Sequence, residues 1–482
     1  MVLGAIAVGR PSFWGDEAAT ISASTRSLPD LARLVSSVDA VHATYYLMMH
    51  GWFLLAPHTE AWSRVPSCLA CGGAGAGVVV LTKLLADRPT ALVAGVIFAV
   101  LPRMTWAATE ARSFAFSALA AVWVTVVLVV ATRRNVASVW VLYSLLLSFS
   151  TVFFIFVALM IPVHCVVVLV HRAGGVVFAR FAAASLAAIA SLVPFVLYTS
   201  HQVGQVNWIA MWALPARVML VRQYFDNAMP VAGVAFLLFL VAVCVRPRPN
   251  LRSLVQPAGA PAGIAVAWMV IPTAVLLVYS DLVQPIYLDR YLTFSVPGMA
   301  LLLAVCVRRL TRNTVQAIGL IVVLAIAAVP DYLDERDRYA KMGMDYSDAA
   351  DLVKARAARG DCLLLDDTVT WEPAPIRAMV QSRPDSYVSL IDVGAGQSAS
   401  EAGTMWSLDR PLDEVLDRLA KCNVIWTLSF RDWTLPSHEA GAALPPGSRF
   451  GQAPAFLRPA EMGFRVVERW QFNENQVTRA IR

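Results

Sequence analysis

The stretch Arg10-Pro-Ser-Phe-Trp-Gly-Asp16-Glu17 follows a short apolar run at the start of the chain. It places two adjacent carboxylates beside an aromatic pair, in a sequence that is 58% hydrophobic and only 15% charged. Ionisable groups next to membrane segments are retained where they face a water-filled cavity or take part in chemistry. The stretch therefore predicts that Asp16 lies at the centre of a functional site.

The apolar runs of the chain recur at lengths that cross a bilayer, for which about 20 residues are needed. They predict a polytopic α-helical membrane protein with about 10–11 transmembrane helices. Residues 1–9 are too short to span, so we expect a first helix that is incomplete here or that starts upstream. Ten further spans are expected at about 62–85, 89–106, 110–131, 136–150, 151–171, 178–198, 231–246, 262–282, 290–307 and 314–330.

The basic residues fall in short clusters between the apolar runs, which argues against nucleic acid as a partner despite a formal net charge of +6. If each segment spans once, five of these clusters lie on one side, which the positive-inside rule places in the cytoplasm. The opposite, extracytoplasmic face then carries the Asp16 loop and the C-terminus. We therefore expect a multi-pass protein of a bacterial plasma membrane, with its site and its C-terminal domain outside the cytoplasm.

The composition changes after Pro330, where a highly charged stretch begins and no apolar run of membrane length follows. We expect residues 1–330 to form the membrane domain, with a first extracytoplasmic loop at 10–61, and residues 331–482 to form a soluble α/β domain. Helices are expected at 346–359, 374–381 and 412–420, and strands at 362–365, 387–392, 423–428, 464–472 and 476–481. Cys362 and Cys422 could pair in an exported domain, but two buried free thiols are the preferred interpretation.

The first loop is expected to contain two helices, near 29–38 and 44–56. The second is rich in aromatic residues and suits a helix that lies in the membrane interface and shelters the loop. His42 and His50 flank its Tyr45-Tyr46 pair, and the four side chains are candidates for binding acceptor or sugar. A structural role is the simpler interpretation of either histidine.

Asp16 and Glu17 could act as a general base, as a pair of metal ligands, or as a solvated loop face. Arg290 and Tyr291 open a membrane helix on the outer side, where a guanidinium opposes the positive-inside preference and suggests an anionic partner such as a lipid phosphate. Interfacial snorkelling is the alternative. Arg64 is a further candidate for binding a lipid headgroup or substrate. Arg112 is interpreted first as the ion-pair partner of Glu110 or as a loop anchor, with phosphate binding as the alternative.

Five motifs together resemble the GT-C glycosyltransferases, and are most similar to family-39-like membrane proteins of actinobacteria described as mannosyltransferases. In order along the chain they are Phe13-Trp-Gly-Asp16-Glu17-Ala, Val38-Asp-Ala-Val-His42-Ala-Thr-Tyr45-Tyr46-Leu-Met-Met-His50-Gly-Trp52, Arg64-Val-Pro-Ser67, Glu110-Ala-Arg112 and Asp289-Arg290-Tyr291. The resemblance covers the membrane part, about two-thirds of the chain. Residues 148–153 depart from it, because they lack a histidine expected between two helices.

The resemblance implies an inverting transferase that moves a sugar from a polyprenyl-phosphate donor on the outer face of the plasma membrane. Mannose is the sugar that the resemblance favours. By position Asp16 matches the general base, Arg290 the arginine that meets the lipid phosphate, and 44–56 a juxtamembrane helix. Glu17 would support Asp16 or bind a divalent metal, Mg²⁺ or Mn²⁺. The acceptor would be an envelope lipid glycan, a polysaccharide or a protein.

Two other classes of protein stay open at this point. A lipid or glycan transporter or flippase also carries charge within the membrane, but the charges here gather at one face and no internal repeat is visible. A non-catalytic scaffold, in which the α/β tail is the working part, predicts that Asp16→Ala is silent.

Overall fold

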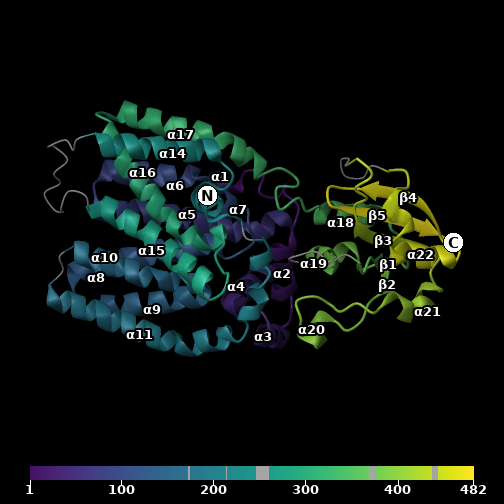
Figure 1. Cartoon of the computed structure of the whole chain (residues 1–482). Coiled ribbons are helices and arrows are strands. Elements are labelled where there is room, and N and C mark those ends of the chain that lie inside the picture. Colours follow the sequence, from purple (N-terminus) through teal and green to yellow (C-terminus); the bar gives the residue numbers. More distant parts are fainter. Residues whose placement is uncertain (172–173, 213, 246–259, 369–375, 437–442) are drawn as a thin grey trace. The chain divides into compact units, whose positions relative to one another are not determined.

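The computed structural model describes residues 1–482 except 172–173, 213, 246–259, 369–375 and 437–442 (Figure 1). Its internal contacts divide the chain into two units. Unit 1 comprises Met1–Val8, Ala40–Tyr45 and Arg64–Glu335, and unit 2 comprises Gly9–Asp39, Tyr46–Ser63 and Arg336–Arg482. The expected division at 330/331 into a membrane and a soluble domain remains a prediction, because the units are defined by contacts and not by a bilayer.

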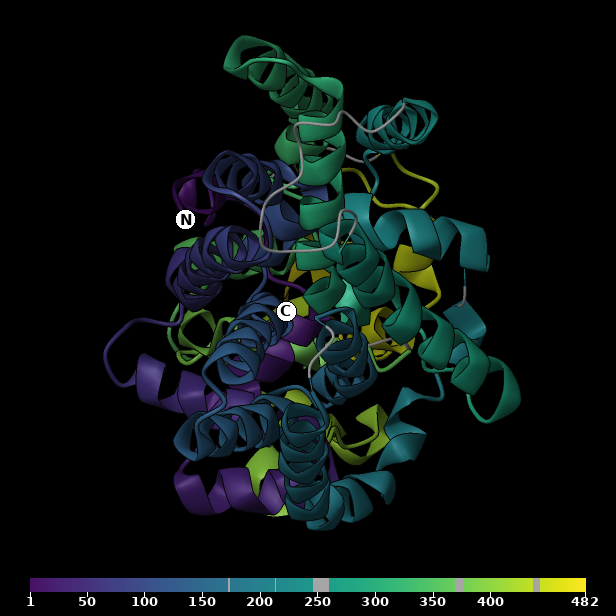
Figure 2. The ribbon, with the colours of Figure 1, turned by 90° about the vertical axis from the view of Figure 1, so that its left-hand side faces the viewer.

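Unit 1 is built from helices, and all ten expected spans fall on helical segments. The long helices run alongside one another, seen from the side in Figure 1 and after a 90° turn in Figure 2. In chain order the helical segments of unit 1 are α1 (Val2–Ala5), η1 (Ala40–His42), the start of α4 (Ala43–Phe53), α5 (Glu60–Leu85), α6 (Arg88–Val100), α7 (Pro102–Ala108), α8 (Phe114–Arg134), α9 (Ala137–Phe153), η2 (Ile155–Leu159), α10 (Met160–Val170), α11 (Gly175–Ser200), η3 (Val203–Val206), α12 (Ile209–Trp212), α13 (Ala216–Phe225), α14 (Met229–Cys244), α15 (Ala260–Leu282), η5 (Asp289–Ser295), α16 (Val296–Leu310) and α17 (Thr314–Asp334).

Six helical segments among the described residues are long and apolar enough to cross a membrane, and eight if two bent pairs each count as one span. The bent pairs are α6 with α7, at 60°, and α13 with α14, at 89°. Two shorter apolar segments, Ala137–Phe153 and Ile155–Val170, account for the remaining expected spans. α17 leaves Val315, Ile318 and Ile326 exposed, as a lipid-facing helix does. The chain is a multi-pass α-helical membrane protein.

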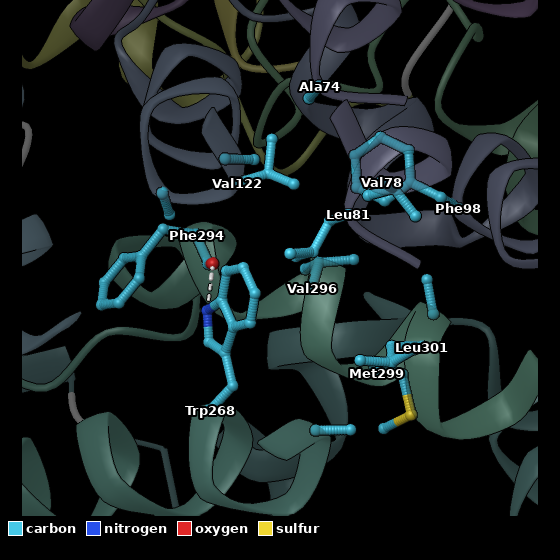
Figure 3. Packing of buried hydrophobic residues seen from close by; sticks show 14 of the residues in the cluster. Ala74, Val78, Leu81, Phe98, Val122, Trp268, Phe294, Val296, Met299 and Leu301 are labelled. Carbon is cyan, nitrogen blue, oxygen red and sulfur yellow. Dashed lines mark hydrogen bonds between the residues drawn. The ribbon is translucent and has the colours of Figure 1, made fainter. Parts of the chain in front are cut away.

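Close helix approach in unit 1 depends on small residues. A Cβ atom at Gly77 of α5 would lie 2.6 Å from Val122 of α8, and one at Gly298 of α16 would lie 3.0 Å from the Cβ of Trp268 on α15. The Trp268 indole N–H donates to the carbonyl of Phe294 at 3.0 Å, inside an otherwise apolar cluster (Figure 3). Small residues at such contacts let backbones pack closely where lipid provides no hydrophobic drive for association.

Unit 2 contains a mixed five-stranded sheet in the order β2-β1-β3-β5-β4. β1 pairs in parallel with β2 and β3, whereas β5 is antiparallel to β3 and β4. The strands are β1 (Cys362–Leu365), β2 (Ile391–Asp392), β3 (Val424–Phe430), β4 (Arg465–Gln471) and β5 (Asn475–Ile481). The helices of unit 2 are α2 (Gly15–Ser24), α3 (Leu28–Ser37), the part of α4 (Ala43–Phe53) from Tyr46 on, α18 (Tyr346–Arg356), α19 (Arg377–Ser382), η6 (Pro384–Ser386), α20 (Ala399–Ala402), η7 (Leu412–Glu414), α21 (Leu416–Leu419), η8 (Ser448–Gly451) and α22 (Pro454–Glu461).

The strands bury both faces, following the period of two of extended chain. Leu363 and Trp426 point to a face covered by α18, α19 and α2, whereas Leu364 and Ile425 point to a face covered by α21 and α22. The α/β tail expected from the alternating pattern is confirmed. Two expectations were wrong in detail: helix α22 was missed, and the strand expected at 387–392 is only the two residues of β2.

Cys362 and Cys422 form a disulfide, with their Cα atoms 5.9 Å apart. The preferred interpretation of two free thiols was therefore wrong. Cys362 begins β1 and Cys422 precedes β3, its parallel neighbour, so strand pairing brings the two sulfurs together. Disulfides persist in oxidising compartments outside the cytoplasm.

Replacing Cys362 and Cys422 together with serine is expected to destabilise unit 2 by about 4 kcal/mol, because the bond closes a loop of 60 residues in the unfolded chain. The measurement is chemical unfolding of the detergent-solubilised protein, followed by the circular dichroism of the sheet. Cys68→Ser is the control, since Cys68 lies in unit 1 and takes no part in the disulfide. Equal stability of the double variant and the wild type would contradict a formed disulfide.

Candidate active site

Asp16 and Glu17 lie in the first turn of α2, a helix that the sequence analysis did not predict. Consecutive helical residues point about 100° apart. Asp16 accordingly stays partly exposed, whereas Glu17 is completely buried. Carboxylates in a first turn are stabilised by the positive end of the helix dipole. Of the two, Asp16 is the carboxylate that is accessible at the surface of the protein.

The segment leading into α2 is fixed by hydrogen bonds within unit 2. The backbone N–H of Phe13 donates to the Ser347 hydroxyl at 3.1 Å, and the backbone N–H of Ser347 donates to the Ser12 hydroxyl at 3.0 Å. Phe13 and Trp14 are buried in the same apolar cluster as α18 and α19. The C-terminal part of the chain therefore sets the position of Asp16.

The other end of α2 is anchored by Arg26. Its Nη2 donates to the carbonyls of Thr404 and Met405, at 2.7 and 3.0 Å, and its Nε donates to the carbonyl of Ser22 at 3.0 Å. Burial lowers the pKa of this guanidinium, an effect that Asp30 opposes. These bonds make α2 a rigid support for Asp16.

α4 brings two further predicted residues into unit 2. Tyr46 is buried and its hydroxyl donates to Asp39 at 2.6 Å, and the Nδ1 of His50 lies 3.0 Å from the carbonyl of Ser24 at the end of α2. Both groups are engaged inside the protein. In this conformation His50 contacts the end of α2 and Tyr46 holds Asp39, and a direct contact of either residue with sugar stays a prediction.

His42 and Arg112 meet within unit 1, with the His42 Nε2 3.2 Å from an Arg112 Nη2. Tyr45 is buried nearby in the sequence, where its ring contacts those of Phe116 and Phe153 at 6.0 and 6.1 Å. His42 is therefore a neighbour of the Arg112 guanidinium. The spacing of the two residues in the sequence did not indicate this contact.

Arg64 is completely buried on α5, and its Nη1 donates to the carbonyl of Val8 at 2.8 Å. Ser67, one turn further along, donates to the carbonyl of Glu110 at 2.5 Å. These bonds tie the Arg64-Val-Pro-Ser67 and Glu110-Ala-Arg112 motifs to neighbouring backbone. In this structure Arg64 thus holds the backbone of the first residues against α5.

Arg290 and Tyr291 lie in η5, at the entrance to α16. The Tyr291 ring stacks on Phe156 at 5.2 Å and lies 6.4 Å from Phe114, and the Arg290 guanidinium lies 5.8 Å from the Trp208 ring. Phe114 follows Arg112 by two residues. The segments that carry Arg112 and Arg290 are therefore neighbours, so two of the predicted phosphate-binding residues start from adjacent elements.

The sequence analysis missed Arg103, the centre of a buried ionic cluster in unit 1. The Nη2 of this fully buried guanidinium lies 2.6 Å from a carboxylate oxygen of Asp289 and 3.0 Å from one of Asp226. Asp289 immediately precedes Arg290, so the cluster fixes the start of η5. A charged residue inside an expected span was the available signal.

One group of carboxylates in the described residues has the spacing of a metal site: ligand oxygens of Asp226, Asp331 and Glu335 lie within 4.8 Å of one another. Oxygen donors of this kind suit Mg²⁺, Mn²⁺ or Ca²⁺. The Arg103 guanidinium contacts Asp226 and offsets part of the charge, and the Thr105 hydroxyl donates to Glu335 at 2.9 Å. The group does not include Asp16 or Glu17.

No family model and no curated protein matches the chain. Among solved structures, ArnT from Cupriavidus metallidurans in the apo state matches with a TM-score of 0.59 and 13% identity, over 99% of this chain and 96% of ArnT. The structure of ArnT bound to undecaprenyl phosphate matches with a TM-score of 0.59 and 14% identity, over the same shares of the two chains. The arabinofuranosyltransferase AftD from Mycobacteria is a looser match, at 0.47 and 15% over 100% of this chain and 41% of AftD.

ArnT is a GT-C glycosyltransferase, and its likeness to this chain extends over almost the full length of both proteins. The GT-C resemblance inferred from the five motifs is thereby confirmed at the level of the fold. The chain is a polytopic helical protein of GT-C type with a C-terminal α/β domain.

Proposed function

We propose that this protein is an inverting glycosyltransferase that moves a sugar from a polyprenyl-phosphate donor to an acceptor of the cell envelope. The observation that carries the proposal is the GT-C fold shared with ArnT, one structure of which holds undecaprenyl phosphate. The adjacent segments of Arg112 and Arg290 support it, because two guanidinium groups suit the phosphate of such a lipid.

In the proposed reaction the Asp16 carboxylate takes the proton of an acceptor hydroxyl. The acceptor oxygen then bonds to C1 of the sugar, and the bond between C1 and the phosphate oxygen breaks with inversion. The lipid phosphate leaves with the electron pair of that bond, and Arg290 and Arg112 stabilise its charge. Glu17 holds the first turn of α2, and Tyr291 packs beside the donor.

Mannose is the proposed sugar and rests on the motif resemblance alone. The acceptor-binding side of the site is proposed to be formed by His42, Tyr45, Tyr46 and His50. The buried members of this group would act by holding neighbouring residues in place. A divalent ion is compatible with the proposal, and Asp16 with Glu17 is the pair inferred from the motifs. Their divergent directions on α2 favour Asp16 acting without Glu17 as a second ligand.

We propose further that Asp16 and the sheet of unit 2 lie outside the cytoplasm. Two observations support this orientation. The disulfide Cys362–Cys422 fits an oxidising compartment, and the basic clusters fit the cytoplasmic ends of the spans. Polyprenyl-linked sugar and envelope acceptor would then meet on the outer face of the plasma membrane.

The test is transfer of radiolabelled mannose from polyprenyl-phosphate mannose to an envelope extract by the purified, reconstituted protein. Transfer that depends on the lipid-linked donor and not on a nucleotide sugar is expected. If another polyprenyl-linked sugar is used instead, the donor assignment changes and the reaction class stands. Movement of labelled lipid across the bilayer without any transfer would favour a flippase.

A further inference from the structure

A cavity of about 330 Å³ lies in unit 2, apart from the residues considered so far, and its lining is part polar and part apolar. Its lining includes Thr368, which follows β1, and the run Arg431–Thr434, which follows β3. The other lining residues are Ser448 of η8, Pro454 at the start of α22, and Gln452 and Ala453 between these helices. The volume lies within the range of small-molecule sites.

The position of the cavity is a place where α/β sheets bind ligands. β1 and β3 are parallel neighbours in the sheet (Figure 1), and the chain leaves β1 for β2 on one side before it returns to β3 on the other. The connection that leaves the carboxyl end of β1 carries α19 on one face, and the connection that leaves the carboxyl end of β3 carries α22 on the opposite face. The carboxyl ends of β1 and β3 therefore form a topological switch point, where connections diverge and leave a crevice.

Both strand ends carry the same turn. Thr368 donates its backbone N–H and its hydroxyl to the Asp366 carboxylate, at 3.0 and 2.6 Å, and Thr434 makes the same two bonds to Asp432, also at 3.0 and 2.6 Å. The two turns hold the walls of the cavity in a defined conformation. A rigid, polar rim of this kind favours a ligand with several hydroxyl groups.

Trp433 supplies an aromatic face at the cavity. Its side chain is 65% exposed, and the Arg431 guanidinium lies 4.4 Å from the ring centroid. The Nε of Arg431 is buried and makes no hydrogen bond within the part of the chain that the structure describes. The C–H bonds of a sugar ring pack well on the electron-rich face of an indole, and its hydroxyls accept from a guanidinium.

The charges around the cavity favour a neutral ligand. Asp432 is buried and its carboxylate lies 3.5 Å from Arg469, and the Nη1 of Arg431 donates to the carbonyl of Asn473 at 3.1 Å. The buried carboxylate thus has an opposite charge beside it, and part of the Arg431 guanidinium is already hydrogen-bonded. A phosphate or carboxylate ligand would meet the negative charge of Asp432 as well as the guanidinium of Arg431.

We propose that this cavity is a saccharide-binding subsite, in which Trp433 stacks on one sugar ring and Arg431, Thr434 and Gln452 bond its hydroxyls. Its role is to hold a part of the glycan acceptor away from the reacting hydroxyl. The role as an acceptor subsite rests on the proposed transferase function, whereas saccharide binding itself does not.

The experiment measures binding of two neutral probes, α1,6-linked mannohexaose and maltohexaose, to the full-length protein in detergent by isothermal titration calorimetry. Trp433→Ala is expected to weaken the better probe about tenfold, since stacking is lost. Trp433→Tyr should keep most of the affinity. Val388→Ala, an exposed change elsewhere in unit 2, is the control and should bind as the wild type does.

The proposal is overturned if neither probe binds, or if Trp433→Ala and the wild type bind the probe with equal affinity. It is also overturned if inorganic phosphate displaces the probe at a concentration 10-fold below that of the probe, as expected for an anion site. Sugar transfer is measured in parallel on the same preparations. Transfer without Trp433-dependent binding rejects the subsite and leaves the transferase. Trp433-dependent binding without any transfer rejects the transferase and leaves the subsite.

Discussion

Replacing Asp16 with asparagine is expected to slow sugar transfer by about 10²–10⁴-fold, the usual contribution of a positioned general base. Asparagine keeps the shape of the side chain and cannot take the acceptor proton. Because Asp16 is partly exposed at the start of α2, the change should leave the fold and the affinity for lipid-linked donor unaltered. Initial rates in proteoliposomes, with donor binding measured separately, provide the test.

Two variants of the same unit separate chemistry from structure. Asp30→Asn removes a carboxylate from the first turn of α3 and should not alter the rate. Glu17→Gln changes a completely buried group, so its main effect should be on thermal stability. A rate for Asp16→Asn within about twofold of the wild type, a difference of under 0.5 kcal/mol in the barrier, would remove Asp16 as the base.

Replacing Arg103 with methionine is expected to destabilise unit 1 by about 3–5 kcal/mol, because it leaves the carboxylates of Asp226 and Asp289 without their buried guanidinium. Since Asp289 precedes Arg290 in η5, donor binding should weaken as well. Thermal unfolding in detergent and donor titration measure the two effects.

The double variant Arg103→Met, Asp289→Asn tests whether the loss comes from uncompensated charge. It should recover part of the stability, because one of the two carboxylates is removed. Arg133→Met changes a basic residue at the end of α8 and serves as the control. A loss in Arg103→Met that is no larger than in the control would contradict the ionic role of the cluster.

The site is less accessible to sequence reasoning than the fold, as Arg103 and α2 illustrate. The partners of Arg103 are Asp226 and Asp289, more than 100 residues away along the chain, and no local pattern links them. α2 lacks a strong sequence signal for a helix, since Gly15 is a poor helix former, and Phe13, Trp14 and Ile21 gain their stability from α18 and α19. Burial likewise separated Asp16 from Glu17, which are equivalent in the sequence.

The sequence by itself determined the features that depend on local composition and periodicity. Apolar runs of membrane length specified the spans, short apolar runs that alternate with helical segments specified β1 and β3, and five motifs specified the GT-C fold. Tertiary structure decided which distant groups meet: the Cys362–Cys422 bond, the Arg103 cluster and the neighbouring segments of Arg112 and Arg290. The physical reason is that hydrophobicity acts residue by residue, whereas ion pairs, disulfides and sites require particular atoms to lie within a few ångströms of each other.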